Sequence, residues 1–201
     1  MLPTLLICIV IFIVILKFKL RAIEQEEAQE EAEFLALEQK ASLPVKRDMN
    51  DLSFSTIPLN TLPFLTNTDK ELQKIQDEVR KLSTKKICSL SNMSNTDLKL
   101  KYGAGNLKEL SEYDQNYTTL LRTLADWGLC LYKHGYLKEA ELVCEYAKAC
   151  GSDIRNTYIT LARISKEQNR IEEIYSLLKF VEPITTTLDL KKAIYDVLNE
   201  Y

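Results

Sequence analysis

Histidine, glycine and proline are scarce in this chain, and the shortage bears first on catalysis and metal binding. The 201 residues include one histidine, His134, and five cysteines. Serine–histidine–aspartate and cysteine–histidine catalysis would both depend on His134, which stands beside Gly135 in a predicted surface turn. One histidine, with cysteines that lack Cys-x-x-Cys spacing, cannot complete a typical zinc site. We therefore predict no catalytic residue, no metal ligand and no cofactor.

The shortage of turn residues and of positive charge excludes two further classes. Five glycines and five prolines are too few for a turn-rich all-β barrel. A formal net charge of −3 is unsuited to binding nucleic acid by neutralising phosphates. The charge is also segregated: residues 1–21 carry three basic and no acidic side chains, whereas residues 22–41 carry seven glutamates against Lys40. No nucleic-acid partner is expected, and no small-molecule substrate is evident.

Residues 1–16 carry no charged side chain and predict a membrane anchor. As a helix they span roughly 24 Å, and Phe18 and Leu20 extend the run toward the roughly 30 Å of a bilayer core. A cleaved secretory signal would need basic residues before the run and a small-residue cleavage site after it, and the chain has neither. Because the basic residues follow the run, we expect a single-pass protein of the cell membrane, anchored by residues 1–20, with its C-terminal domain in the cytoplasm.

Two segments should separate this anchor from the body of the protein. Residues 21–41 are rich in strong helix formers and predict an acidic helical stalk. A coiled-coil dimer is disfavoured because Ile23, Glu27, Glu30 and Phe34 do not form an apolar seam. Residues 42–67 contain three prolines and predict an extended linker. Half of residues 52–65 are large and apolar, so this segment should pack across the helical body, unless it is a sticky tether or a partner-binding motif.

The rest of the chain, residues 68–201, predicts an all-α domain. A capping box at Thr68–Glu71 opens a helix over 69–84, and a second signal opens a short helix over 96–101. Residues 102–106 contain a Gly-x-Gly, but no strand precedes it and no third glycine follows. A turn between two helices explains it better than a phosphate loop. From residue 106 onward, apolar residues recur every three or four positions to the end of the chain, as in stacked amphipathic helices.

Part of this domain resembles the tetratricopeptide repeat. The pattern lies in Leu124, Trp127, Gly128, Leu131, Gly135-Tyr136-Leu137, Ala140, Cys144 and Ala147. A second register, with Tyr158 and Leu161-Ala162, matches loosely, and Ile174 stands where the family has a small residue. The repeats would cover about 121–154 and 155–186. With the anchor, stalk and linker, the chain is similar to uncharacterised membrane-anchored tetratricopeptide-repeat proteins of Gram-positive bacteria, which bring no known activity.

The resemblance implies a membrane-tethered scaffold or adaptor that performs no catalysis and binds a protein or peptide at the cytoplasmic membrane face. Three alternatives stay open: an envelope-assembly factor with the same domain outside the cell, a membrane-tethered enzyme with a polar pocket near His134 or the turn at 102–106, and an inert structural spacer. In the repeat register, the polar neighbours of the packing positions are the candidate partner-binding residues. They are Asn116, Arg122, Asp126, Asn156 and Thr160.

Overall fold

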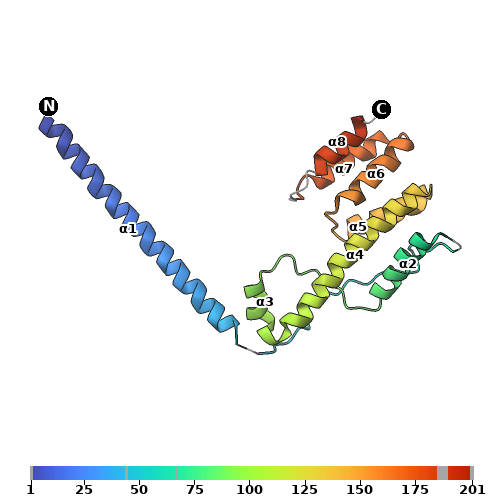
Figure 1. Cartoon of the computed structure of the whole chain (residues 1–201), viewed down its shortest axis with the longest axis horizontal. Helices are drawn as coiled ribbons and strands as arrows, with labels where there is room; N and C mark the ends of the chain where they lie inside the picture. The colour runs from blue at the N-terminus through green and yellow to red at the C-terminus, as the bar shows by residue number, and fades with distance from the viewer. Residues whose placement is uncertain (1, 44, 67, 185–189, 200–201) are drawn as a thin grey trace. The chain divides into compact units, whose positions relative to one another are not determined.

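The described part of the chain is built from helices and has no strand, which confirms the all-α class (Figure 1). The computed structural model describes residues 2–43, 45–66, 68–184 and 190–199. The chain divides into two compact units. Unit 1 comprises Met1–Asp51 and Asn92–Lys108, and unit 2 comprises Leu52–Ser91 and Glu109–Tyr201.

Unit 1 begins with one long helix, α1 (Leu2–Ala41), which runs through both the predicted anchor and the predicted stalk. Within the residues that the structure describes, no helix is both long enough and apolar enough to cross a membrane. The predicted transmembrane anchor at residues 1–20 is therefore wrong, and so are the single-pass membrane assignment and the location deduced from it. The physical reason is the short uncharged run: it ends at Leu16, after roughly 24 Å, and α1 continues through Lys17, Lys19 and Arg21.

The C-terminal end of α1 is held by a second helix of unit 1, α3 (Asn95–Tyr102). The ammonium of Lys99 lies 3.3 Å from a carboxylate oxygen of Glu38, and Ala41 is buried. The Ser94 hydroxyl caps α3, and the side chain of Asp97 in turn accepts from the backbone of Ser94, as in a capping box. These contacts fix the last turn of α1 and leave the rest of that helix without a described tertiary contact in its own unit.

The glycine turn at 103–106 holds another part of unit 1. Gly103 ends α3 with a φ of +85°, and the 3-10 turn η1 (Ala104–Asn106) follows it. The N–H of Gly105 donates to the carbonyl oxygen of Val45 at 3.1 Å, and the N–H of Arg47 donates to the carbonyl oxygen of Tyr102 at 2.9 Å. The amide of Asn106 also donates to the Arg47 carbonyl, at 2.8 Å. The turn therefore binds a segment of its own chain.

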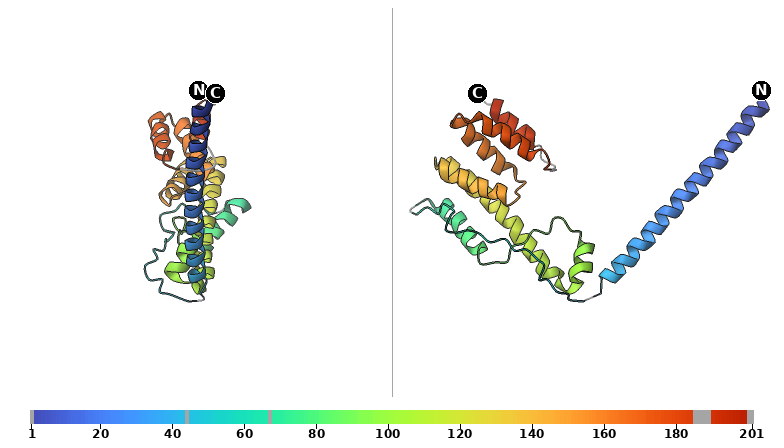
Figure 2. Two further views of the ribbon diagram at one scale, coloured as in Figure 1. Left: turned by 90° about the vertical axis from the view of Figure 1, so that its left-hand side faces the viewer. Right: turned by 180° about the vertical axis from the view of Figure 1, so that it is seen from behind.

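Unit 2 is a stack of helices: α2 (Lys70–Leu82), the part of α4 (Leu107–Lys133) from residue 109 onward, α5 (Leu137–Ala149), α6 (Arg155–Glu167), α7 (Ile171–Val181) and α8 (Leu190–Asn199). α6 packs against α5, α7 and α8 (Figure 2). The turn between α4 and α5 contains Gly135, whose φ is +80°. The tetratricopeptide pattern falls on α4–α5 and α6–α7, so each predicted repeat corresponds to one helix pair.

Small residues let α4 and α5 approach closely, as the repeat pattern predicts. A Cβ atom on Gly128 would lie 2.3 Å from the Sγ atom of Cys144 on α5, and Ala140 and Ala147 are fully buried. At such a distance a side chain at position 128 would push the two helices apart. Trp127, the neighbour of Gly128, is also fully buried.

The segment 52–65 packs into the core of unit 2, which confirms that prediction. Ile57 and Leu62 are buried in the same cluster as Trp127, and the ring of Phe64 lies 5.0 Å from the indole between centroids. The side-chain amide of Gln76 on α2, itself buried, accepts from the N–H of Leu65 at 2.6 Å and donates to its carbonyl at 3.1 Å. Both backbone polar groups of this extended residue are thus satisfied inside the protein.

Candidate partner-binding groove

The five predicted partner-binding residues do not form one surface. Arg122 and Asp126 are exposed on α4, and Asn156 is exposed on the first turn of α6. Thr160 is fully buried, and Asn116 is buried with its amide donating to the Lys86 carbonyl at 3.0 Å. Neither of these two side chains is available to a partner on the surface, since both lie inside unit 2.

Asp126 does line a groove between α2 and α4, with a volume of about 580 Å³. α2 and α4 run antiparallel along it. Asp69, at the start of α2, contacts His134 just past the end of α4. Toward the end of α2, Arg80 lies over the ring of Phe64, which packs on Trp127 in α4. The α2 wall consists of Glu71, Lys74, Ile75 and Glu78, and the α4 wall of Thr123, Asp126, Leu129, Cys130, Lys133 and His134.

The α2 wall was not identified from the sequence, because the mixed charges of this helix, taken alone, are typical of a solvated face. Leu72, Gln76, Val79 and Leu82 form its buried stripe. Glu71, Ile75 and Glu78 make a second stripe beside it, at helical spacing. Ile75, an apolar residue between two glutamates of this stripe, was the available sequence signal. It indicates a groove wall only when the position of α4 opposite it is known.

Charge is unevenly distributed along the groove. Within the described residues, Glu71, Lys74, Asp126 and Lys133 form no ion pair, while Glu78 lies 3.7 Å from Lys81 on its own helix. Because α2 and α4 are antiparallel, Glu78 and Asp126 lie toward the same end, away from His134. Ile75 and Leu129 provide apolar surface between the charges. The groove therefore offers the carboxylates of Glu78 and Asp126 at one end, Glu71 and Lys133 at the other, and Lys74 beside the apolar middle.

His134 closes the opposite end of the groove and connects its two walls. One carboxylate oxygen of Asp69 caps α2 by accepting from the N–H of Leu72 at 2.8 Å, and the other contacts Nε2 of His134. Nδ1 of His134 lies 2.8 Å from the carbonyl oxygen of Cys130. Both ring nitrogens thus face hydrogen-bond acceptors, an arrangement that suits a structural contact holding the start of α2 against the end of α4.

The same contacts bring Cys130, His134 and Asp69 together, which raises the question of a catalytic triad. The Cys130 sulfur lies 3.8 Å from Nδ1 of His134, but that nitrogen is already engaged by the Cys130 carbonyl oxygen at 2.8 Å. Burial raises the pKa of the Cys130 thiol, and the negative charges of Glu71 and Asp69 raise it further. An activated cysteine needs a lowered pKa and a free base, so this arrangement does not favour nucleophilic catalysis.

Alkylation kinetics test this conclusion directly. We expect iodoacetamide at pH 7 to modify Cys130 in the native protein at least about tenfold more slowly than in the urea-unfolded chain, because burial disfavours the thiolate. The rate constant for each cysteine is measured by mass spectrometry across pH 6–10. Cys144 is an internal reference, since burial raises the pKa of its thiol to about 12. Rapid modification of Cys130 with a midpoint below pH 8 would contradict the structural role and favour the enzyme alternative.

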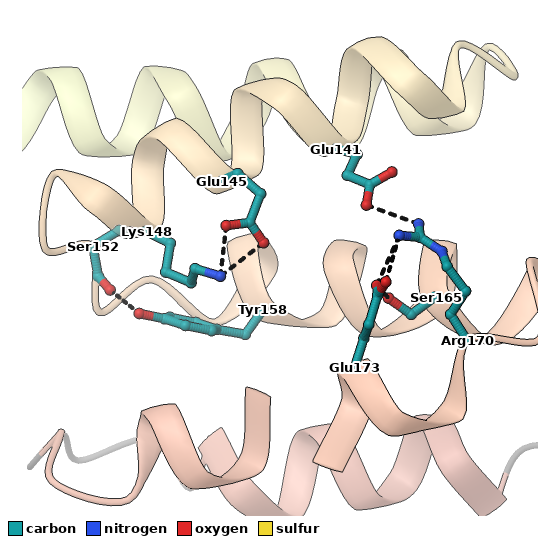
Figure 3. Close-up of polar contacts among 8 residues, drawn as sticks. All are labelled: Glu141, Glu145, Lys148, Ser152, Tyr158, Ser165, Arg170 and Glu173. Atoms are coloured by element: carbon teal, nitrogen blue, oxygen red, sulfur yellow. Dashed lines mark hydrogen bonds and ion pairs between the residues drawn. The ribbon is translucent and has the colours of Figure 1, made fainter. Parts of the chain in front are cut away.

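A smaller cavity of about 280 Å³ lies between α5, α6 and α7 in unit 2. Arg170 bridges Glu141 and Glu173 at 2.8 Å each, and Ser165 donates to Glu173 at 3.1 Å (Figure 3). The charges in this region thus pair with one another, as does Lys148 with Glu145 at 2.6 Å. The Arg170–Glu141 and Ser165–Glu173 contacts link neighbouring helices, and we assign them to holding α5, α6 and α7 together.

Metal ligands and known relatives give no further guide to function. Among the described residues, no group of three or more histidine, cysteine, aspartate or glutamate side chains is arranged to hold a metal ion. No family model, curated protein or solved structure matches the chain. The tetratricopeptide resemblance therefore stays a prediction, and the α2–α4 groove is the most promising binding surface of unit 2.

Proposed function

We propose that unit 2 is a non-catalytic binding module of an adaptor protein, and that it holds a segment of a protein partner in the α2–α4 groove. The observation that carries this proposal is the composition of the groove: apolar residues lie among charged residues, and four of these, Glu71, Lys74, Asp126 and Lys133, form no ion pair with the described part of the chain. Unpaired charges on the two walls can be paired by a ligand without first breaking an internal contact.

The size and direction of the groove favour a peptide or helix as the ligand. It runs along two antiparallel helices, and its volume of about 580 Å³ can take several side chains of a partner. An amphipathic helix laid in such a groove would place apolar side chains on Ile75 and Leu129. A basic side chain of the partner would face Glu78 and Asp126, where the two carboxylates lie toward one end.

The resemblance of residues 121–186 to tetratricopeptide repeats agrees with this proposal, since stacked helix pairs present extended surfaces that recognise partners. The fold of unit 2 adds a feature outside the repeat pattern. The segment 52–65 and α2 cover one side of the first helix pair, so the partner would bind between α2 and α4 instead of on a bare repeat surface.

Site-directed photo-crosslinking tests the proposal. A photoreactive amino acid replaces Lys74 in the groove, or, as a control, Leu142, which is exposed on α5. In cells, the groove probe should capture a distinct partner that the control probe does not capture. Adding Asp126→Arg to the groove probe should reduce this capture at least about tenfold, because a carboxylate that pairs with the partner becomes a repelling cation.

A matched charge reversal guards against a general effect of charge. Asp196→Arg makes the same change at an exposed position of α8 and should leave capture unchanged. Circular dichroism must show that both variants fold as the parent protein does. Equal capture by the Asp126→Arg and Asp196→Arg proteins would refute binding in this groove.

A further inference from the structure

α1 carries an apolar surface that no described residue of unit 1 covers. Between Leu16 and Lys40, every side chain that the structure describes is exposed except that of Glu38, which is half-buried. The exposed large apolar residues of this stretch are Leu16, Phe18, Leu20, Ile23, Phe34, Leu35 and Leu37. A helix in water depends mainly on tertiary packing of its apolar face, and exposed apolar surface of this kind marks an interaction site.

Most of these residues follow the spacing of a coiled-coil seam. Steps of four and three residues from Leu16 lead through positions 20, 23, 27, 30, 34 and 37. Five of the seven seam positions are large and apolar, and the other two are Glu27 and Glu30. These two glutamates decide how a second helix can lie on the seam.

In a parallel dimer, each seam residue faces its own copy. Glu27 would then oppose Glu27 of the second copy, and Glu30 would oppose Glu30, so two pairs of like charges would meet in the seam. In an antiparallel dimer, residues whose numbers add to 50 face one another. Leu16 then packs against Phe34, while Leu20 faces Glu30 and Ile23 faces Glu27. The like-charge contacts thus leave the seam, and each of these glutamates lies against an apolar residue of the second copy.

Four of the six contacts beside the seam join opposite charges in the same antiparallel register, while positions 24 and 26, both glutamate, each lie opposite their own copy. Lys17 lies on one side of the seam, where Glu31 of the second copy would lie, and Lys19 lies on the other side, opposite Glu33. All four side chains are exposed in unit 1. Because a two-fold dimer repeats every contact, each of these ion pairs forms twice. Flanking charges of this kind set the orientation of paired helices.

We infer that α1 is a self-association helix, which pairs with α1 of a second copy of this chain as an antiparallel coiled coil over residues 16–34. Glu27 and Glu30 interrupt the apolar seam and so disfavour a coiled coil, but in this arrangement neither meets its own copy. The inference does not depend on the binding groove of unit 2, although a dimer would present two grooves to a partner and so strengthen binding to a multivalent target.

Charge reversals at positions 17, 19, 31 and 33 test the inference. The oligomeric state of the full-length chain is measured by sedimentation velocity. The parent protein should be a dimer that weakens as salt concentration rises. Lys17→Glu/Lys19→Glu should raise the dissociation constant at least about tenfold, and so should Glu31→Lys/Glu33→Lys. The protein with all four changes should recover dimerisation, because each ion pair is restored with its sign reversed. Arg21→Glu, on the outer face of the helix, should have little effect.

Mixing the two double variants tests whether these charges govern pairing, while rescue by the four-fold exchange distinguishes the orientations. In the antiparallel register, one variant supplies four acidic side chains and the other four basic ones, so they should form a heterodimer more tightly than either forms a homodimer. A parent protein that sediments as a monomer would overturn the inference and leave the apolar face of α1 to another kind of partner. A dimer that the four-fold exchange does not rescue, or a mixture without heterodimer, would overturn the antiparallel register.

Discussion

Replacing Trp127 with alanine should lower the free energy of unfolding by about 3–5 kcal/mol, the usual cost of removing a large buried aromatic side chain. The indole is fully buried, and its ring centroid lies 5.0 Å from that of Phe64. It belongs to a cluster that also includes Leu62, Val79 from α2 and Ala140 from α5. Its loss would therefore leave a cavity where the segment 52–65, α2 and the first helix pair meet.

Urea unfolding followed by far-ultraviolet circular dichroism measures this effect without depending on tryptophan fluorescence. Trp127→Phe is the matched control. The indole N–H has no hydrogen-bond partner among the described residues, so phenylalanine removes volume but breaks no hydrogen bond. We expect it to cost less than half as much as alanine. Similar losses for the two variants would show that burial of the ring is not what stabilises this core.

Gly103→Ala should disrupt the turn of unit 1, at a cost of about 3 kcal/mol or more. The residue has φ +85° and ψ 143°, a conformation that only glycine adopts without strain. A Cβ atom there would lie 2.0 Å from the carbonyl oxygen of Val45, which accepts the hydrogen bond from Gly105. Since this neighbour is backbone, it cannot rotate away as a side chain could. The segment 45–47 must leave the turn.

Native-state hydrogen exchange at the amides of Gly105 and Arg47 reports this change, and a loss of about 3 kcal/mol corresponds to roughly 100-fold faster exchange. Gly135→Ala is the control that separates the cost of a strained backbone conformation from the cost of the steric clash with Val45. Gly135 also has a positive φ, +80°, but a Cβ atom there would meet nothing within 4 Å. It should cost only the strain of a left-handed residue, about 1–2 kcal/mol, measured at its own turn. Equal local losses at the two glycines would mean that contact with Val45 has no part in holding the turn.

Local sequence pattern predicted several helices well, because periodicity is a property of a single element. The predicted helix over 69–84 is observed as α2 over Lys70–Leu82, and the short helix over 96–101 as α3 over Asn95–Tyr102. Glycine and alanine at repeat positions predicted the close approach of α4 and α5, which Gly128 makes possible. The excess of large apolar residues in 52–65 also predicted its burial, since leaving them exposed would be costly.

Sequence pattern gave wrong predictions where the role of a residue depends on which other part of the chain packs against it. Thr160 and Asn116 are polar and stand beside packing positions, so the repeat register placed them on a surface. The structure buries both, and Asn116 binds the Lys86 carbonyl. Likewise, the apolar start of α1 was interpreted as a membrane anchor from hydropathy alone. Its uncharged run ends at Leu16, and no described helix is long and apolar enough to span a membrane.

The sequence alone determined the helical class, the pairing of helices in residues 121–186 and the scarcity of groups for catalysis. Each follows from residue types and their spacing within a short stretch. Only the tertiary structure decided that α2 lies along α4 to form a groove, that His134 closes it on Asp69, and that Gly103 meets Val45. Such contacts join residues far apart in the chain. They depend on how apolar faces pack together, and many pairings of amphipathic helices satisfy the same local pattern.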